Sequence, residues 1–511
     1  MEQSTFKSRT VAENPRTGAL LENVEAVRSI AVAVEGTLGP KGLDTMLVGE
    51  MGEVIVTNDG VTILEKMEIH HPAARMISQI ARAQQEEVGD GTTTATLLAA
   101  TLVEEGTKQV GRGVPVAKVI AGIRRGIQHA LEGMQKMAHP IWDLKDEWLQ
   151  GIAFTAGREQ EDVTDLVIEA ALMVGREKLL EKNFRLSEAV TAHPRVESGV
   201  FSGLLVKGER LNLQVSDTKE LPRILVIGGD LTPEPVETQS EAGFRKLEEN
   251  REALLSAIGK LVESNVEVVL VEGEVDPLVE DRLSSADLLV VSQISREDIN
   301  RVAEHIGARI LMRTSLSKPI AELEAFFGMA ELVECEERLG CIRVISGAGK
   351  SFATILVSAS TEEVVRERER IAKDAAAAVQ AAVRGGFLPG GGAAELALAR
   401  EVEKHRDLVQ GTEAFGVSAV AEALHRPMSQ VVANAGFNPL EKVEEVKALQ
   451  WKRQSKSLGV DCDRGVISDM VDMGVVDPLP VKYHALQAAG EVSTAILRIH
   501  TVVPMKGIDA R

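Results

Sequence analysis

The sequence predicts a multidomain protein of mixed α and α/β class, in which helical segments from both chain ends form one domain around an inserted α/β module. Three observations carry this prediction. The chain has 511 residues, more than one ordinary hydrophobic core needs, so about two to four domains are expected. Apolar residues recur at helical spacing near both ends, whereas short β-branched runs alternate with helical stretches in the middle.

The N-terminal part is predicted to be mainly helical up to about Met137. Apolar residues at steps of three and four predict a helix over 18–38, which the Gly-Pro-Lys-Gly turn at 39–42 ends. The β-like run 53–57 ends at Asn-Asp-Gly at 58–60, which is typical of a tight turn. We therefore expect one helix that packs against a partner, followed by a short β segment and further helices.

The middle of the chain, from about 221 to 312, alternates between two patterns. Helical stretches are predicted over 240–264 and 295–306. Four short β-branched runs lie around them, at 223–229, 266–273, 287–293 and 308–313. This alternation is typical of an α/β unit with a mainly parallel sheet.

The last part is helical again from about Glu362. A long helix is predicted over 360–385, because Ser360 and Glu363 form a capping box and two glycines end the pattern. Its apolar stripe consists of Val364, Ile371, Ala375, Val379 and Ala382. Asp374 falls on the flank of this stripe, where a carboxylate can face a cleft, although by itself such an aspartate is more often simply solvated.

The composition argues against several classes of function. The formal net charge is −20 and we find no basic patch, so binding to nucleic acid or to anionic membranes is not expected. The longest apolar runs have strand length and the N-terminal residues contain no apolar signal segment, so we expect a soluble, cytoplasmic protein. The three cysteines form no CxxC pair and are expected to be buried free thiols, with a metal or redox role as the alternative.

The stretch Val-Gly-Asp-Gly-Thr-Thr-Thr at 88–94 opens an Ala- and Leu-rich helix. Backbone N–H groups at such a start, together with the helix dipole, favour a phosphate as occupant. Asp90 would repel phosphates unless it holds Mg²⁺, a hard cation that prefers oxygen ligands. A turn in which a threonine simply caps the helix is the alternative.

Three further Gly-rich turns attract attention. The turn at 38–42 by itself is no more than a helix stop, and Asp59 in the turn at 57–64 is by itself an ordinary turn residue. The three glycines at 390–392 follow the long helix, and close backbone approach to a ligand is one reason for such a run.

Four motifs occur together in a fixed order and make the pattern specific. They are TLGPKGLDTMLV (37–48), TNDGVTIL (57–64), VGDGTTTATLL (88–98) and GGGAAE (390–395). This set resembles the chaperonins, most closely group II, to which the thermosome and the eukaryotic cytosolic chaperonin belong. The C-terminal stretches GVVDPLPVK (474–482) and GEVSTAILRIHTVV (490–503) are similar to the same group. The host is left open, a bacterial one included.

The resemblance implies three domains in each subunit. An equatorial ATP-binding domain would take 1–138 and 387–511, an intermediate hinge domain 139–208 and 354–386, and an apical client-binding domain 209–353. Group II members carry a built-in lid protrusion, here expected around 233–264. Its apolar stripe would run through Phe244, Leu247, Leu254, Ile258 and Leu261, although core packing explains the residues from 254 onward equally well.

The resemblance also implies roles for individual residues. Asp90 would be the Mg²⁺ ligand, Asp59 would position the attacking water, and Asp374 would activate it. The nucleotide would be bound by Leu38, Gly39, Pro40, Gly91, Thr92, Thr93, Thr94, Gly391, Gly392 and Asp477. The sequence departs from the family at 155–160, where no phosphate-sensing lysine is evident and Arg158 is a candidate substitute.

The implied function is an ATP-hydrolysing, Mg²⁺-dependent chaperonin subunit that encloses non-native client proteins. Its partners would be copies of itself in two stacked rings of about eight subunits, with no separate co-chaperonin. A ring-forming scaffold of the same fold without productive ATP turnover is the alternative. A metabolic ATP-dependent ligase or kinase is a third reading, but no second-substrate site is recognisable.

Overall fold

The computed structural model describes residues 15–49, 52–194, 197–236, 241–336 and 340–502. The chain divides into two compact units. The first takes the described parts of 1–168, 179–184 and 373–511, and the second takes those of 169–178 and 185–372. Both chain ends thus contribute to one unit, and the other is an insertion. The finer division into three domains stays a prediction, because the range assigned to the intermediate domain contributes to both units.

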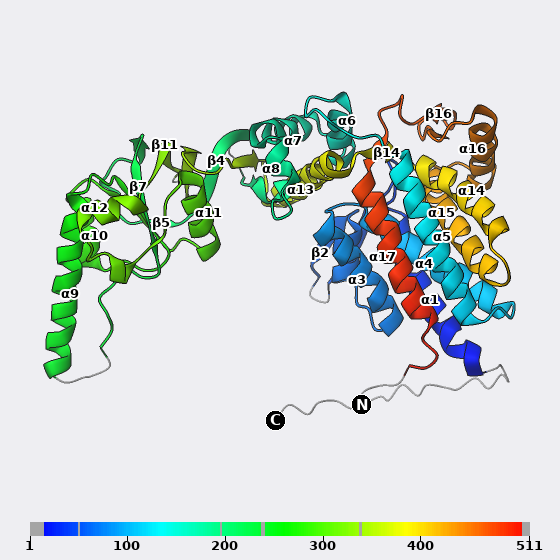
Figure 1. Cartoon of the computed structure of the whole chain (residues 1–511), viewed down its shortest axis with the longest axis horizontal. Helices are drawn as coiled ribbons and strands as arrows, with labels where there is room; N and C mark the ends of the chain where they lie inside the picture. The colour runs from blue at the N-terminus through cyan, green and yellow to red at the C-terminus, as the bar shows by residue number, and fades with distance from the viewer. Residues whose placement is uncertain (1–14, 50–51, 195–196, 237–240, 337–339, 503–511) are drawn as a thin grey trace. The chain divides into compact units, whose positions relative to one another are not determined.

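The first unit is built mainly from long helices that pack along one another (Figure 1). These helices are α1 (Pro15–Glu35), α3 (Pro72–Glu87), α4 (Thr92–Gly111), α5 (Val116–Met137), α14 (Ala393–Leu408), α15 (Glu413–Asn434) and α17 (Leu479–Leu497). Glycines let α5 and α15 approach closely, since a Cβ added at Gly122 would lie 2.0 Å from the Glu413 carbonyl oxygen. Helices from the two chain ends share one apolar core, which explains why neither end shows a complete domain by itself.

Shorter elements complete the first unit. They are the helices α2 (Gly60–Lys66), α6 (Glu147–Ala156) and α16 (Pro439–Arg453), and the strand pairs β1 (Thr45–Val48) with β2 (Val54–Thr57), β14 (Phe387–Pro389) with β17 (Val476–Pro478), and β15 (Leu458–Val460) with β16 (Ile467–Asp469). Three helices, α7 (Glu161–Val174), α8 (Arg176–Leu180) and α13 (Glu362–Gly385), continue from one unit into the other. Within α13 the division falls between Ala372 and Lys373.

The tight turn expected at 58–60 is not present. Gly60 begins α2 and Asp59 is its N-cap, with Oδ2 accepting a 2.9 Å hydrogen bond from the Thr62 N–H. An aspartate followed by glycine suits a hairpin turn and a helix cap equally, and here the antiparallel partner of β2 precedes it in the chain. The expected helix stop at 39–42 is confirmed, because α1 ends at Glu35 and turns follow.

The second unit contains the predicted α/β module. The four predicted runs form β7 (Arg223–Gly228), β8 (Val268–Val271), β9 (Leu289–Ser292) and β10 (Leu311–Met312), and they pair in parallel in the order β10-β7-β8-β9. The helices are α9 (Glu241–Val262), α10 (Pro277–Ser284), α11 (Arg296–Ile306) and the short α12 (Ile320–Leu323). Two of them, α9 and α11, were predicted, and α10 was missed.

The sheet is larger than expected because antiparallel strands extend it. They include β4 (Gly199–Lys207), β5 (Glu209–Arg210), β6 (Thr218–Glu220), β11 (Gly328–Glu336), β12 (Cys341–Gly347) and β13 (Ala353–Val357), while β3 (Val190–Ala192) pairs in parallel with β13. The main strand order is β3-β13-β4-β12-β11-β7-β8-β9-β5. The expectation of a mainly parallel sheet therefore holds for the strands that the sequence indicated and not for the whole sheet.

The parallel strands are buried on both faces, which explains their unbroken apolar runs. One face packs against α11, through residues such as Ile224, Val226 and Val302. The opposite face packs against α9 and α10, through residues such as Leu225 and Ile227. Alternate residues of each strand thus contribute to two separate cores.

The helix α9 has two different halves. Its C-terminal half packs on the sheet through Leu254, Ile258 and Leu261, so core packing is the correct interpretation for these residues. The N-terminal half extends away from the sheet, and Phe244 is 66% exposed (Figure 1). Residues 237–240 of the range assigned to the lid lie outside the described residues.

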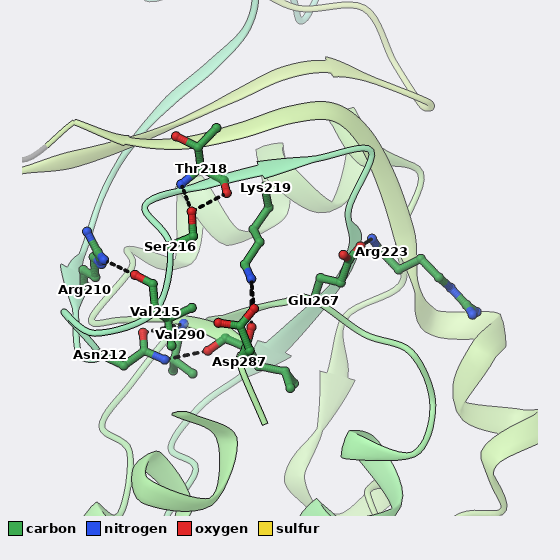
Figure 2. A network of polar contacts seen from close by, with 11 residues as sticks. Arg210, Asn212, Val215, Ser216, Thr218, Lys219, Arg223, Glu267, Asp287 and Val290 are labelled. Carbon is green, nitrogen blue, oxygen red and sulfur yellow. Dashed lines mark hydrogen bonds and ion pairs between the residues drawn. The ribbon is translucent and has the colours of Figure 1, made fainter. Parts of the chain in front are cut away.

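A side-chain network closes the outer edge of β9 (Figure 2). The buried side chain of Asn212 donates to the Leu288 carbonyl at 2.5 Å and accepts from the Val290 N–H at 3.2 Å. It therefore extends the antiparallel pairing that β5 begins on β9. Beside it, Lys219 donates to the Asp287 carboxylate at 2.7 Å. Backbone groups at this edge of the sheet, the Leu288 carbonyl and the Val290 N–H, are thus hydrogen-bonded to a side chain and are not open to pair with another strand.

The second unit should lose stability as pH falls because of His305. This histidine of α11 is buried; the Gly347 N–H donates to Nε2 at 3.0 Å, which requires the neutral ring, and Nδ1 donates to the Lys350 carbonyl at 2.9 Å. Burial lowers the pKa of His305. Below about pH 6.5, where histidine protonates in the unfolded chain, the unfolded state takes up more protons. This stabilisation is complete above that pH and is lost as pH falls towards the lowered pKa.

The urea midpoint measured between about pH 5 and 8 tests this expectation. The midpoint should fall towards low pH, and the fall should be smaller in His305→Asn. His70→Asn, which removes an exposed histidine of the first unit, is the matched control. An identical pH dependence in the wild type and His305→Asn would contradict the prediction.

Candidate functional site

The turn Gly89–Gly91, here called the GDG turn, links the end of α3 to the start of α4. Gly89 and Gly91 have φ angles of 82° and 79°, in the left-handed region that glycine adopts without strain. Gly91 is the N-cap of α4, and no side chain caps the helix. The alternative that a threonine serves as the cap is therefore wrong. The N-terminal N–H groups of a 20-residue helix begin at this turn.

Two other predicted turns lie against the GDG turn and the start of α4. A Cβ added at Gly60 would be 2.6 Å from Thr93 Oγ1, so the start of α2 touches the threonine run. The Thr37 and Thr93 hydroxyls are 3.5 Å apart, which brings the end of α1 to the same place. A Cβ added at Gly89 would lie 2.5 Å from Ala377 Cβ on α13. Segments that are far apart in the sequence therefore converge at the start of α4.

The turn Leu38–Gly42, here called the LGPKG turn, is held by a side chain from α15. Asn434 donates to the carbonyls of Glu35 and Leu38, both at 2.8 Å. Gly39 has a φ of 86° and is exposed together with Pro40. The turn thus presents exposed backbone beside the threonine run of α4.

The aspartates predicted to position and to activate the attacking water, Asp59 and Asp374, belong to different helices. Asp59 caps α2 and also accepts a 2.6 Å hydrogen bond from the Thr62 hydroxyl. Asp374 lies on α13 three residues before Ala377, so the two share a helix face, and Ala377 contacts the GDG turn. The structure thus places Asp59 beside α4 and the helix turn of Asp374 next to the GDG turn.

Asp90 lies in a field of several charges. Its Oδ1 accepts a 2.6 Å hydrogen bond from the Gly91 N–H. Burial raises the pKa of Asp90, and the carboxylates of Asp477 and Asp59 raise it further, against the opposing effects of the Gly91 N–H and Arg158. A carboxylate surrounded by other carboxylates is stabilised by a cation, which fits the predicted Mg²⁺ ligand.

Among the residues that the structure describes, no group of three or more His, Cys, Asp or Glu side chains is arranged to hold a metal ion. A Mg²⁺ ion held by one or two carboxylates together with substrate phosphates and water would not require such a group. A role for the cysteines as metal ligands gains no support from the described residues.

Arg158 occupies a strained turn near Asp90. Both Arg158 and Glu159 have positive φ angles, 53° and 60°. Left-handed residues other than glycine cost energy and cluster at functional sites. The segment 155–160 thus contains two strained residues, and it places a cation in the field of Asp90.

The glycines Gly390–Gly392, here called the GGG turn, lie beside Asp477. The Gly390 N–H donates to the Val475 carbonyl at 2.9 Å, and β14 and β17 pair with Leu388 opposite Asp477. Gly391 and Gly392 have positive φ angles, and Gly392 is the N-cap of α14. The structure therefore brings together the predicted residues of the nucleoside side.

Two groups of residues near the site were missed by sequence reasoning. Lys482 is buried and contacts Glu395 at 2.6 Å and Asp477 at 2.8 Å; these three residues are here called the ion triplet. Gln84 and His484 are hydrogen-bonded to each other at 2.6 Å next to the GDG turn. Glu395 and Lys482 both lie within quoted motifs, but no local pattern signals that they pair.

The described part of the chain contains no helix with the length and hydropathy needed to cross a membrane. A pocket of about 550 Å³ lies between α5 and α17, and none of the predicted site residues lines it. It is lined by polar and charged side chains such as Arg124, Glu132 and Glu491.

Comparisons with known proteins agree with one another. The model of the TCP-1/cpn60 chaperonin family matches residues 30–507. A thermosome subunit of Methanocaldococcus jannaschii is 31% identical over 499 residues, which cover 94% of this chain and 91% of that protein. The thermosome subunit beta of Archaeoglobus fulgidus is 34% identical and covers 95% of this chain and 92% of its own length.

A solved structure gives the same result. The crystal structure of a group III chaperonin in the open state superposes with a TM-score of 0.89 and is 42% identical, covering 96% of this chain and 99% of that chain. The resemblance inferred from the four motifs is thus confirmed over nearly the whole length. The chain belongs to the TCP-1/cpn60 chaperonin family.

Proposed function

We propose that this chaperonin subunit binds and hydrolyses ATP with Mg²⁺ to drive the enclosure and folding of non-native proteins. The observation that carries the proposal is the convergence of the LGPKG turn, the start of α2 and the GDG turn at the N-terminus of α4. Exposed backbone and a helix N-terminus suit phosphates, and neighbouring carboxylates suit a cation.

Each group has a part in the proposed reaction. The N–H groups at the start of α4 and the threonine hydroxyls would hold the phosphate oxygens, and the LGPKG and GGG turns would contact the rest of the nucleotide. Asp90 would hold Mg²⁺, which when bound supplies charge neutralisation at the phosphates. Asp59 would orient a water molecule, and Asp374 would accept its proton. Arg158 would sense the charge at Asp90 and the phosphates.

Hydrolysis is favoured over a scaffold without ATP turnover because Asp59, Asp90 and Asp374 are all present. Phosphoryl transfer to water depends mainly on positioning and on charge stabilisation, which these groups and the backbone amides supply. A chain that only assembled would have no need to keep carboxylates beside a phosphate-binding helix start.

Self-assembly is supported by the β1–β2 hairpin. Its register places Met46 opposite Val56 and Val48 opposite Val54, and all four side chains are exposed. An exposed apolar hairpin face with unpaired edges is suited to docking another chain. We propose copies of this chain as the occupant, in two stacked rings of about eight subunits.

The remaining parts of the proposal follow the sequence predictions. The exposed N-terminal half of α9 supports a built-in lid within 233–264, so no separate co-chaperonin is proposed. The equatorial, intermediate and apical ranges given above are proposed as the three domains. A cytoplasmic location stays a prediction from the sequence.

ATP turnover and its Mg²⁺ dependence test the enzymatic part of the proposal. The wild type should hydrolyse ATP, and Asp90→Ala should need a much higher Mg²⁺ concentration for half-maximal nucleotide binding, since a ligand of the ion is lost. Asp472→Ala, which removes an exposed aspartate, is the matched control. Unchanged Mg²⁺ dependence in Asp90→Ala would refute the metal role.

The native mass tests the assembly. A particle near sixteen times the 55.0 kDa chain is expected, with 233–264 protected from protease only when ATP is being hydrolysed. A monomer or small oligomer that does not respond to nucleotide would contradict the folding chamber and favour the scaffold.

A further inference from the structure

The Gln84 side chain lies between the GDG turn and the start of α17 and uses all of its hydrogen-bonding groups. Its amide nitrogen donates to the Asp90 carbonyl at 2.8 Å and to the Val481 carbonyl at 3.0 Å. Its amide oxygen is 2.6 Å from His484 Nδ1. Gln84 is completely buried. Since both amide protons are taken, one orientation of the side chain satisfies every partner.

This orientation determines which atom of His484 donates to Gln84. The Gln84 oxygen has no proton to give, so His484 Nδ1 must carry the hydrogen and donate it. His484 lies on the first turns of α17 and is half-buried. The histidine therefore keeps the Gln84 amide turned with its nitrogen towards the two carbonyls.

The backbone of Gln84 holds the same turn from the other side. Its carbonyl accepts the N–H groups of Val88 at 3.0 Å and Gly89 at 3.2 Å, which ends α3. A Cβ added at Gly91 would lie 2.6 Å from Val481 Cγ1, so the turn also packs directly on α17. Gln84 thus contacts the residues before, within and beyond the GDG turn.

We propose that Gln84, oriented by His484, is a positioning residue that holds Asp90 and the GDG turn in the geometry needed for Mg²⁺ and phosphate. The inference rests on the proposed ATPase function. Asp90 has glycine on both sides, so its backbone would otherwise be free to rotate. A tether on its carbonyl removes that freedom and sets the direction of its carboxylate.

The tether also links the two sides of the site. Val481, whose carbonyl accepts a hydrogen bond from Gln84, precedes Lys482, which contacts Asp477. The first turn of α17 therefore connects the GDG turn with the nucleoside side through consecutive residues. If Gln84 no longer holds the Asp90 carbonyl, the GDG turn with the proposed Mg²⁺ ligand should shift more than the nucleoside side, because the ion triplet still holds Asp477.

The experiment compares kcat and the Mg²⁺ concentration for half-maximal ATP hydrolysis in the intact assembly. Gln84→Met keeps the size of the side chain and removes the tether, and kcat should fall about 10–100-fold with an increased Mg²⁺ requirement. Gln380→Met is the matched control, because Gln380 is also buried and donates to two carbonyls, of Leu179 and Phe184, neither of which belongs to the GDG turn. It should lose stability without a change in Mg²⁺ requirement.

A second pair of variants keeps the test decisive if Gln84→Met does not fold. His484→Leu removes the donor to Gln84 and should raise the Mg²⁺ requirement, whereas His484→Asn places an N–H near the position of Nδ1 and should restore it. Rescue by asparagine is not expected of a residue that only fills space.

The outcomes are distinguishable. An active wild type with unchanged kcat and Mg²⁺ requirement in Gln84→Met and in His484→Leu would overturn this inference alone. Equal losses in Gln84→Met and Gln380→Met at constant Mg²⁺ requirement would assign Gln84 a structural role and overturn it too. A wild type that neither binds nor hydrolyses ATP would overturn the proposed function and this inference together.

Discussion

Asp374→Ala should lower kcat for ATP hydrolysis by about 10²–10⁴-fold while ATP still binds, because a positioned general base contributes a factor of this size. The carboxylate is carried by α13 and not by the phosphate-binding turns, so its removal leaves the start of α4 intact. Ala377, on the same face of α13, touches Gly89, which places this helix turn beside the proposed phosphate site. Single-turnover hydrolysis and equilibrium ATP binding separate the two effects.

Two further variants sharpen this test. Asp374→Asn keeps the shape of the side chain and removes its basicity, so it should be nearly as slow as Asp374→Ala. Asp407→Asn removes an exposed carboxylate from α14 and should leave kcat unchanged. If Asp374→Asn retained kcat within about threefold of the wild type, Asp374 would have no role as a general base. Urea unfolding of each variant shows whether a slow enzyme is also an unstable one.

Lys482→Met should lower the free energy of unfolding of the first unit by about 3–5 kcal/mol, the cost of leaving a buried charge without its partner. Lys482 is 6% exposed and Glu395 is 2% exposed, and their charged atoms are 2.6 Å apart. Glu395 Oε2 has no hydrogen-bond partner among the described residues, so the lysine is its main compensation. Methionine keeps the length of the side chain and removes only the charge.

The pH dependence of this contribution follows from the lysine. Burial by itself lowers the pKa of Lys482, but the carboxylates of Asp477 and Glu395 outweigh it and raise the pKa above its usual range. A group with a raised pKa in the folded state contributes its full stabilisation below its unfolded pKa, about 10.4 for lysine, and loses it only at higher pH. At neutral pH the charged lysine therefore makes its full contribution, and Lys482→Met should show the whole decrease in the free energy of unfolding.

A double variant separates the charge effect from packing. Glu395→Gln added to Lys482→Met removes the uncompensated carboxylate and should recover part of the lost stability. Lys404→Met, at an exposed surface pair on α14, is the matched control and should cost less than about 1 kcal/mol. A Lys482→Met variant within about 1 kcal/mol of the wild type would show that the ion triplet does not stabilise the unit.

Much of the candidate site was accessible to sequence reasoning because its turns are local. The GDG turn needs left-handed backbone at Gly89 and Gly91, and glycine supplies it wherever the chain later places the turn. Asp59 shows the limit of this reasoning, since aspartate before glycine suits a hairpin and a helix cap alike. Its role as a cap became clear only from the bond to the Thr62 N–H.

The same limit applies to α9. Its apolar stripe at helical spacing was compatible with both a lid and a core. In the structure only the C-terminal half of the helix packs on the sheet. A periodic pattern shows that a face is apolar, but the partner of that face lies elsewhere in the chain. The antiparallel strands around the parallel core were missed because strands such as β11 alternate buried and exposed residues within polar sequence.

The sequence by itself determined the helical chain ends, the buried parallel strands, the Gly-rich turns and, through the order of four motifs, the chaperonin family. These features depend on residues within a few positions of one another. Only the tertiary structure decided that Lys482 pairs with Glu395, and that Gln84 is bound to His484, 400 positions away. Such pairs have no local signature, because burial and contact arise when distant helices pack around a shared core.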